Sequence, residues 1–512
     1  MRQSTRIIMN SAFLYGQQAA DMLIQILLMG FILSRISDAA YGIFLLATTV
    51  QMAMSLVRNA ISKGCVTQLA RAHELRDGET ICRVVTSASL FLIIPSVLAM
   101  VLSVVLAKPL APWLNVTPDL YDTFVTVMWL SGLDVLLQVP LYPFRSVLEA
   151  QQRYGIVAAV QTASRFLRAG LIVASFLVIE NDVLWVMVAT VAADFLVAVA
   201  FQVMAYRAEP ALRFRMRYFH WPLLAGMLVF SSFLMLSTAA NFAAIEGSKW
   251  IVARLINVET VTYLGVTTFI ILGMQRIVQT MTLVLVPVAS QCQARGDQRR
   301  LGEMLVRGTR YAAISSFAII AVLTPVMSVL LGLWLKPELA WLGPYAAVIG
   351  VVGAISLPGD TSLQILNGMG DSRRPFVAIL IGSTVTVTSV IVTVGFLDLG
   401  LWGVIGSKAA GLAVMYTGLM LLALKSTGTS AGRLAWRAFI QPTIPAVGAG
   451  CVCQLLQWYL QPHSWLGLIE VCGPSLVVYG LLLLPFVARD EWNLARSALA
   501  RIKAIGRPKP AV

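Results

Sequence analysis

The stretch VPLYPFRSVLEAQQRYGIVA, residues 139–158, follows the fourth long apolar segment of the chain, and its pattern returns as LPGDTSLQILNGMGDSRRPFVA at residues 357–378, after the tenth. Pro140 aligns with Pro358 at an offset of 218 positions. This offset spans six apolar segments, so both copies have the same orientation. We therefore expect a parallel repeat about an axis along the membrane normal.

The composition around this repeat is that of a membrane protein. Of the 512 residues, 58% are hydrophobic and only 12% are charged, with a mean hydropathy of +0.81. A soluble chain carries about twice that charged fraction. Runs such as 84–107, 183–206 and 311–333 are long enough to cross ~30 Å of hydrocarbon as helices. The chain is therefore predicted to be an all-α polytopic membrane protein.

Hydropathy and turn residues predict fourteen spans. They lie near residues 7–33, 41–63, 84–107, 121–144, 155–178, 183–206, 222–252, 262–288, 311–333, 343–366, 376–396, 401–424, 438–460 and 466–488. Together with the repeat, they predict two six-helix lobes, two additional helices and a basic tail. The corresponding residues are 1–210, 211–430, 431–490 and 491–512.

The distribution of basic residues predicts the orientation. If the N-terminus is cytoplasmic, the cytoplasmic segments hold 27 Lys or Arg residues, against 5 on the outer side. Such a bias predicts that both termini are cytoplasmic. It also explains most of the net charge of +14 as topology signals against anionic lipid headgroups, so no nucleic-acid partner is expected.

The sequence contains no visible catalytic or cofactor motif. The six cysteines and three histidines are scattered, which predicts neither a disulfide framework nor a metal site. There is no GxxxxGK[ST] stretch and no Ser/His/Asp arrangement, and the aqueous loops are too short for a catalytic domain. We therefore expect no enzymatic activity and no cofactor.

Deep cations are the strongest candidates for a binding site. Arg165 and Arg168 lie ~15 to 20 Å into the fifth span, and their i, i+3 spacing places both on one helix face. Arg276 is similarly deep in the eighth span, which belongs to the second lobe. Arg58 lies ~7.5 Å deeper than the interfacial Lys63. Cations from both lobes at one depth predict a shared cationic cavity, although Lys408, the sixth cation within the spans, has no assigned role.

Three carboxylates, Asp21, Asp134 and Asp194, lie at comparable depth. Two interpretations stay open. The carboxylates could pair with the arginines and lock helices of the first lobe together, or the arginines could face the cavity and bind phosphate through bidentate hydrogen bonds. Glu246 and Lys249, at i, i+3 spacing near the outer end of the seventh span, predict a local salt bridge.

Several stretches resemble bacterial polysaccharide repeat-unit flippases. NSAFLYGQQAADMLIQILLMGFILSRISDAAYGIFLLATTVQ is similar to that family's first two helices. IVARLINVETVTYLGV, VPVASQCQARGD and LGLWGVIGSKAAG look like its seventh span, its eighth-to-ninth loop and its twelfth span. The resemblance covers nearly the whole chain, and the order and spacing of the motifs carry it.

The resemblance implies membership of a superfamily shared with multidrug and toxin extruders and with the lipid II flippase. It implies a V-shaped pair of lobes around a central cavity, in the bacterial inner membrane. The expected function is to flip undecaprenyl-diphosphate-linked oligosaccharide to the outer leaflet by alternating access, for assembly of O-antigen, exopolysaccharide or capsule. The polysaccharide polymerase and chain-length proteins are expected partners, besides the polyprenyl-linked cargo and membrane lipid.

The resemblance also suggests roles for single residues. VRNAISKG places Arg58 where the lipid II flippases carry an essential arginine on the second helix, whereas Asp21 stands where those proteins have a basic cluster. We therefore expect a cargo other than lipid II, with its diphosphate bound by Arg165, Arg168, Arg58 and Arg276. The alternative is a proton- or sodium-coupled multidrug or cation antiporter, in which Asp21, Asp134 and Asp194 would form the ion site; the deep arginines favour the flippase.

Overall fold

The computed structural model describes residues 3–486, and among these the side chains of residues 3–15 and 228–234 are not described. The described part is helical and contains no β-strand. The predicted basic tail, residues 491–512, lies outside the described residues. The all-α fold expected from composition is therefore confirmed.

The first lobe is a bundle of long helices. Side-chain caps mark three of their starts, because the side chains of Ser37, Asp77 and Asp182 accept hydrogen bonds from backbone N–H groups that the helix leaves unpaired. The helices are α1 (Gln3–Leu33), α2 (Asp38–Glu74), α3 (Gly78–Trp113), α4 (Tyr121–Gln138), α5 (Tyr142–Ala150), α6 (Tyr154–Val178) and α7 (Val183–Ala208).

The second lobe follows the same order, with more breaks inside its spans. Its helices are α8 (Trp221–Ile245), α9 (Gly247–Leu255), α10 (Val258–Thr282), α11 (Leu285–Ala294), α12 (Gln298–Trp334), α13 (Gly343–Ser356), α14 (Asp360–Gly368), α15 (Arg373–Gly395) and α16 (Gly400–Thr427). Three further helices, α17 (Ala431–Leu434), α18 (Gln441–Leu460) and α19 (Trp465–Leu483), complete the described chain.

The helix boundaries reproduce the predicted repeat. α5 (Tyr142–Ala150) and α14 (Asp360–Gly368) have equal lengths and lie 218 positions apart, and each follows a short 3₁₀ turn containing a proline. The caps Asp77 and Asp297 are 220 positions apart, and each follows a residue with positive φ. The repeat is therefore visible in backbone geometry as well as in sequence, although the lobe limits at residues 210, 430 and 490 stay predictions.

Thirteen helical segments of the described chain are long and apolar enough to cross a membrane. The remaining predicted span, residues 222–252, forms α8 and α9. It includes residues 228–234, whose side chains lie outside the description, and it is not one of the thirteen. The predicted fourth and tenth spans are each longer than expected, because α5 and α14 extend them to Ala150 and Gly368.

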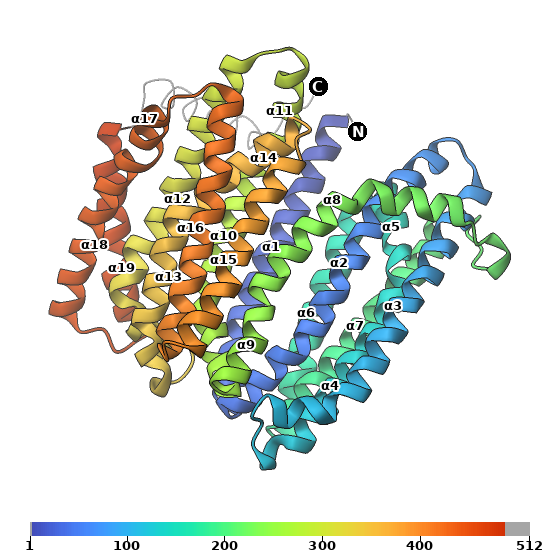
Figure 1. Ribbon diagram of the computed structural model, residues 1–512, viewed down its shortest axis with the longest axis horizontal. Helices are drawn as coiled ribbons and strands as arrows, with labels where there is room; N and C mark the ends of the chain where they lie inside the picture. Colours follow the sequence, from blue (N-terminus) through green and yellow to red (C-terminus); the bar gives the residue numbers. More distant parts are fainter. Residues whose placement is uncertain (1–2, 487–512) are drawn as a thin grey trace, which may run out of the picture.

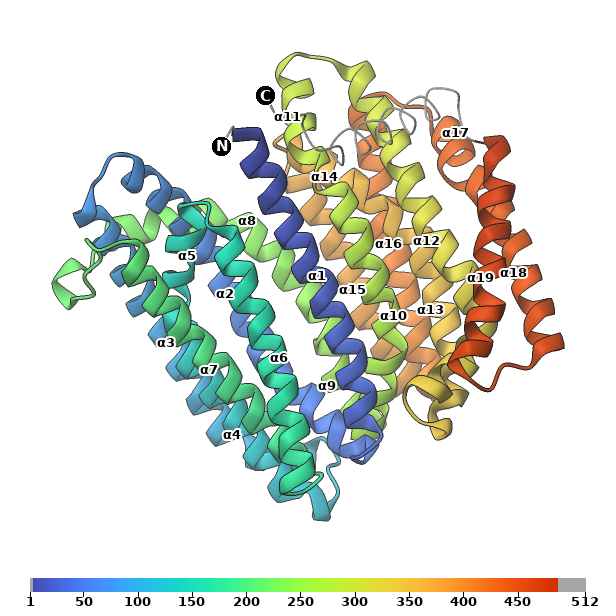
Figure 2. The ribbon, with the colours of Figure 1, turned by 180° about the vertical axis from the view of Figure 1, so that it is seen from behind.

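The two lobes form a V (Figure 1). They meet at the end where α9 lies and diverge toward the end that carries the N-terminus (Figure 2). Apart from the contacts of α1, of α8 and of the linker 209–220, the inter-lobe hydrogen bonds of the described residues lie at the closed end. They join Asp38 to Thr262, Tyr263 and Lys336, Asn115 to Arg254, and Thr49 to Trp250.

Helices α1 and α8 contact both lobes. Gln17 of α1 donates to Gln161 of α6 at 2.6 Å, whereas Trp334 of α12 donates to the Ile26 carbonyl at 2.7 Å. α8 begins against the first lobe, where Met227 packs on Gly64 and Cys65, and its later part packs on α15 of the second lobe. These two helices therefore connect the lobes along the sides of the V.

Candidate functional site

A cavity of about 550 Å³ lies between the lobes. Its wall is formed by α1, α2, α6 and α7 of the first lobe and by α8, α9, α10, α13, α15 and α16 of the second. Contributions from both sides are what a site at a lobe interface requires, because movement of one lobe against the other then changes the access to it. The predicted cationic residues can be placed relative to this cavity.

Arg165 and Arg168 both line the cavity, and both pair with a carboxylate. Arg165 Nε lies 3.6 Å from Asp21 Oδ1 on α1, and Arg168 donates a hydrogen bond to Asp194 on α7. The helical i, i+3 spacing places both guanidinium groups on the cavity side of α6. The pairing with carboxylates and the placement at the cavity are therefore both present, and phosphate binding by these arginines stays a prediction.

Arg276 reaches the same cavity from the second lobe. Its Nη1 donates to Gln25 Oε1 of α1 at 3.0 Å, and in the described part of the chain it forms no ion pair. Thr280, one turn further along α10, donates to Gln18 Oε1 at 3.0 Å. The seam between α1 and α10 is therefore polar, and it carries one positive charge without a carboxylate partner.

Arg58 is not among the residues that line the cavity. Its guanidinium lies 4.5 Å from the ring centroid of Tyr142, the first residue of α5, which is a cation–π distance. Its predicted contact with substrate stays a prediction, because in this conformation the aromatic ring and not the cavity is its neighbour.

Asp134 lies behind the cavity wall. It is fully buried, accepts a hydrogen bond from Gln138 Nε2 at 2.6 Å, and interacts electrostatically with Asp194, Arg168 and Arg58. It forms no ion pair with any described residue. Asp134 is therefore the carboxylate of the predicted trio that has no direct cationic partner.

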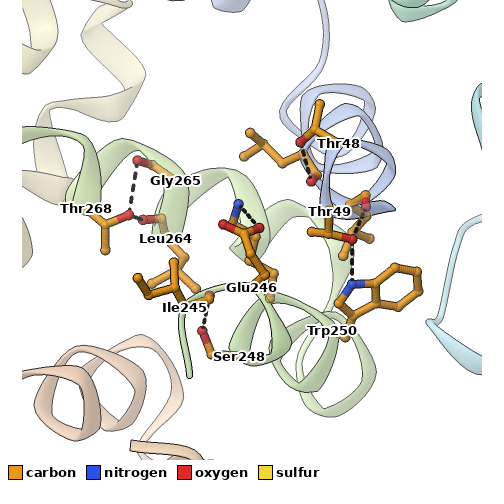
Figure 3. A network of polar contacts seen from close by, with 12 residues as sticks. Thr48, Thr49, Ile245, Glu246, Ser248, Trp250, Leu264, Gly265 and Thr268 are labelled. Carbon is orange, nitrogen blue, oxygen red and sulfur yellow. Dashed lines mark hydrogen bonds and ion pairs between the residues drawn. The ribbon is translucent and has the colours of Figure 1, made fainter. Parts of the chain in front are cut away.

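A second charged cluster, missed as a site in the sequence, lies on the second lobe. Glu246 Oε2 and Lys249 Nζ are 2.7 Å apart, which confirms the predicted local salt bridge, and Lys408 Nζ lies 3.4 Å from the Ile245 carbonyl oxygen. All three charged residues are buried and line the cavity. Figure 3 shows Glu246 with its ion pair, close to the hydrogen bond between Trp250 and Thr49 that joins the lobes.

The structure gives Lys249 a neighbourhood that the sequence did not indicate. Counting along the chain placed it among the outer cations, and in the structure it stands on α9, directly after the break at Glu246, where it also lines the cavity. One feature of the sequence could have indicated this cluster: Lys408 stands eight residues beyond the start of α16, inside an apolar span. Only the packing of α16 beside α8 and α9 shows that these charges belong to one cluster.

The cavity carries an excess of positive charge. Its charged lining residues and their carboxylate partners comprise five cations, Arg165, Arg168, Arg276, Lys249 and Lys408, and three carboxylates, Asp21, Asp194 and Glu246. Arg276 and Lys408 account for the difference. Because unpaired charge is costly away from water, this arrangement favours an anionic ligand. No group of three or more metal-ligating side chains occurs in the described part of the chain.

Comparisons with known proteins agree with this architecture. A family model described as polysaccharide biosynthesis protein matches residues 18–338. No curated protein sequence matches the chain. Among solved structures, the lipid II flippase MurJ in an inward closed conformation has a TM-score of 0.71 at 11% identity, covering 95% of this chain and 100% of that one.

Multidrug transporters share the fold as well. An inward-facing multidrug resistance MATE family transporter of the MOP superfamily has a TM-score of 0.68 at 14% identity, covering 80% of this chain and 94% of that one. The outward-facing conformation of such a transporter has a TM-score of 0.58, also at 14% identity, with coverage of 83% and 95%. At these identities the likeness establishes the fold alone. The transported molecule has to be inferred from the residues of the cavity.

Proposed function

Because the chain belongs to the polysaccharide biosynthesis protein family, we propose that it flips polyprenyl-diphosphate-linked oligosaccharide repeat units across a bacterial inner membrane by alternating access. The observation that carries this proposal is the excess of positive charge inside a cavity shared by both lobes. A diphosphate carries the negative charge that offsets this excess, and the repeat units serve the assembly of a surface polysaccharide.

The diphosphate binds between Arg165, Arg168 and Arg276. Arginine presents planar pairs of donors that match phosphate oxygens, and Asp21 and Asp194 hold the two α6 arginines in place without blocking the cavity. Arg276 contributes the charge that no carboxylate offsets. Because it stands on the second lobe, the anion bridges both lobes and can couple its own passage to their movement.

The saccharide lies toward the cluster of Glu246, Lys249 and Lys408. Carboxylate and ammonium groups there can exchange hydrogen bonds with sugar hydroxyls, and Tyr41 and Phe269 supply aromatic surface on the same wall. The polyprenyl chain stays in lipid at the side of the V. Arg58, outside the cavity lining in this conformation, contacts the diphosphate only after the lobes have moved.

The orientation follows from the positive-inside rule. With both termini cytoplasmic, the diverging end of the V faces the cytoplasm, and this structure corresponds to the state that accepts cargo from the inner leaflet. Polysaccharide polymerase and chain-length proteins act next, on the outer side.

A coupled antiporter is the second candidate, and Asp134 is the observation in its favour. A buried carboxylate with no ion pair in the described structure can bind a proton or sodium ion. Against cation export, Asp21 and Asp194 are already paired with arginines, which leaves the cavity positive. The same Asp134 chemistry could instead couple an ion gradient to flipping.

The test is transport of a defined undecaprenyl-diphosphate sugar in proteoliposomes, with and without ion gradients. Arg165→Ala with Arg168→Ala should abolish flipping, whereas Arg299→Ala with Arg300→Ala, at the exposed start of α12, should leave it unchanged. Full transport by a well-folded Arg165→Ala, Arg168→Ala variant would contradict the proposal. Export of organic cations without flipping would establish the antiporter instead.

A further inference from the structure

The segment that joins the lobes has an unusual sequence. Between the end of α7 at Ala208 and the start of α8 at Trp221, the chain reads EPALRFRMRYFH, residues 209–220. From Arg213 onward, arginines alternate with large apolar side chains. Three arginines stand in five residues, and no acidic residue occurs after Glu209.

The first lobe holds this segment in a fixed position. The backbone N–H of Arg213 donates to Cys82 Sγ at 3.1 Å, and the N–H of His220 donates to Ser87 Oγ at 2.8 Å. Leu212 is buried in the core beneath. The segment is therefore a built surface at the edge of the first lobe, beyond the ends of α3 and α7 (Figures 1 and 2).

Its outward-facing side chains are both apolar and cationic. Met216 is 69% exposed, Trp221 58% and Phe219 44%, and the segment follows directly on the candidate membrane span Val183–Ala208. Arg213 and Arg215 form no ion pair with any described residue, and Arg217 donates only to Tyr218 Oη, at 2.9 Å. Beside them a pocket is lined by Arg83, Arg217 and Tyr218, with Glu79 engaged by Arg83 at 2.6 Å.

We propose that residues 213–221 bind the anionic phospholipid headgroups of the membrane surface on the side of the N-terminus. Guanidinium groups pair with lipid phosphates, while Met216, Phe219 and Trp221 insert at the boundary between headgroups and acyl chains. Charge complementarity selects this occupant, because an unpaired basic segment beside transmembrane helices is attracted to anionic lipid. In a loop surrounded by water, three exposed large apolar side chains would be unfavourable, because apolar surface is more stable away from water.

The position of the segment gives lipid binding a consequence. It is the covalent link between the lobes and runs directly into α8, which packs on α2 at Met227 and ends beside the cavity at Glu246. Headgroups held by the arginines fix the start of α8 at the membrane surface. Anionic lipid therefore restrains the one helix through which the covalent link reaches the cavity.

The experiment uses the full chain in nanodiscs of phosphatidylcholine containing increasing fractions of phosphatidylglycerol. Hydrogen–deuterium exchange of residues 209–221 should slow as phosphatidylglycerol increases. This dependence should disappear in a variant that combines Arg213→Gln, Arg215→Gln and Arg217→Gln. Each arginine contributes roughly fivefold to the affinity for anionic lipid, so the three substitutions together weaken lipid binding about a hundredfold. No cargo is present, so the result is independent of the proposed function.

The matched control removes three arginines from the corresponding end of the second lobe. Arg295→Gln, Arg299→Gln and Arg300→Gln take away the same charge from an exposed segment that has no interleaved apolar side chains, and the dependence should persist. Loss of the dependence in this control, or equal exchange of the unmodified chain at every lipid composition, would overturn the proposal. Met216→Ser with Phe219→Ser should raise exchange at every composition; unchanged exchange would refute insertion.

Discussion

At the scale of single residues, the cavity is defined by which charges have partners. Arg168 and Asp194 are each about four-fifths buried and share a direct hydrogen bond. Among the described residues, the hydrogen-bond partners of Arg276 and Lys408 are an amide oxygen and a backbone carbonyl, respectively. Removing the partner of a paired cation should therefore lower the thermal stability, whereas removing an unpaired cation should raise it.

We expect Asp194→Leu to lower the thermal midpoint, because it strands Arg168 without its partner at a cost of roughly 3 kcal/mol. Arg168→Leu with Asp194→Leu should recover most of that stability but should not flip the cargo. Thermal unfolding and proteoliposome transport separate the two effects. Recovery of both properties in the double variant would show that the pair serves only to hold α6 and α7 together.

Substitution of Lys408 should raise the thermal stability. Lys408→Met replaces a buried ammonium that lacks a direct carboxylate partner, and we expect the thermal midpoint to rise by the equivalent of about 1–3 kcal/mol. Cargo affinity should fall roughly tenfold, because one of the two uncompensated charges disappears. Lys425→Met, at the exposed end of the same helix, is the control and should change neither quantity. A stabilised variant with intact affinity would place Lys408 outside the binding site.

At the scale of elements, the closed end of the V depends on small residues where helices cross. A Cβ added at Gly42 of α2 would lie 2.2 Å from the Val258 carbonyl oxygen at the start of α10. Such a contact forces α2 and α10 apart, because backbone atoms at a helix start have little freedom to move away.

Gly42→Ala should therefore widen the closed end and weaken this conformation. Distances between spin labels placed at Asp119 and Glu338, both exposed at that end, measure the change. Gly406→Ala is the matched control, since nothing lies within 4 Å of the added Cβ. An unchanged distance distribution in Gly42→Ala would mean that the lobes do not pivot on this crossing.

At the scale of the whole molecule, Asp38 joins the lobes at the closed end. Lys336 Nζ lies 2.6 Å from its Oδ1, Tyr263 Oη lies 3.4 Å from its Oδ2, and Thr262 donates to its backbone carbonyl at 2.6 Å. One residue of the first lobe thus binds three residues of the second, and every one of these contacts must break before the cavity opens at this end.

Asp38→Asn removes the charge but keeps the shape, so the closed end should open more often, about tenfold for 1.4 kcal/mol of lost interaction. Labelling of a cysteine placed at Thr48, on the cavity wall, by an impermeant reagent added from that side reports the population. Asp371→Asn serves as the control, because its partner Arg374 belongs to the same lobe. Equal labelling of the unmodified chain, Asp38→Asn and Asp371→Asn would show that the contacts of Asp38 do not hold the closed end together.

The sequence alone determined the properties that are local or periodic. Apolar length gave the membrane spans, and the offset between Pro140 and Pro358 gave a repeat that recurs in the helix boundaries. The shared helix face of Arg165 and Arg168 followed from the i, i+3 spacing, and both line the cavity. These predictions need no knowledge of neighbouring helices, because hydrophobicity and helical geometry are properties of each segment by itself.

Only the tertiary structure decided which charges meet. Asp21 and Arg165 are 144 residues apart, and Lys408 approaches Ile245 across 163 residues, so no spacing within either segment indicates the contact. Arg58 faces Tyr142 and is not among the residues that line the cavity. Sequence fixes how far along its own helix a side chain stands, whereas the rotation and packing of each helix against its neighbours decide what that side chain faces.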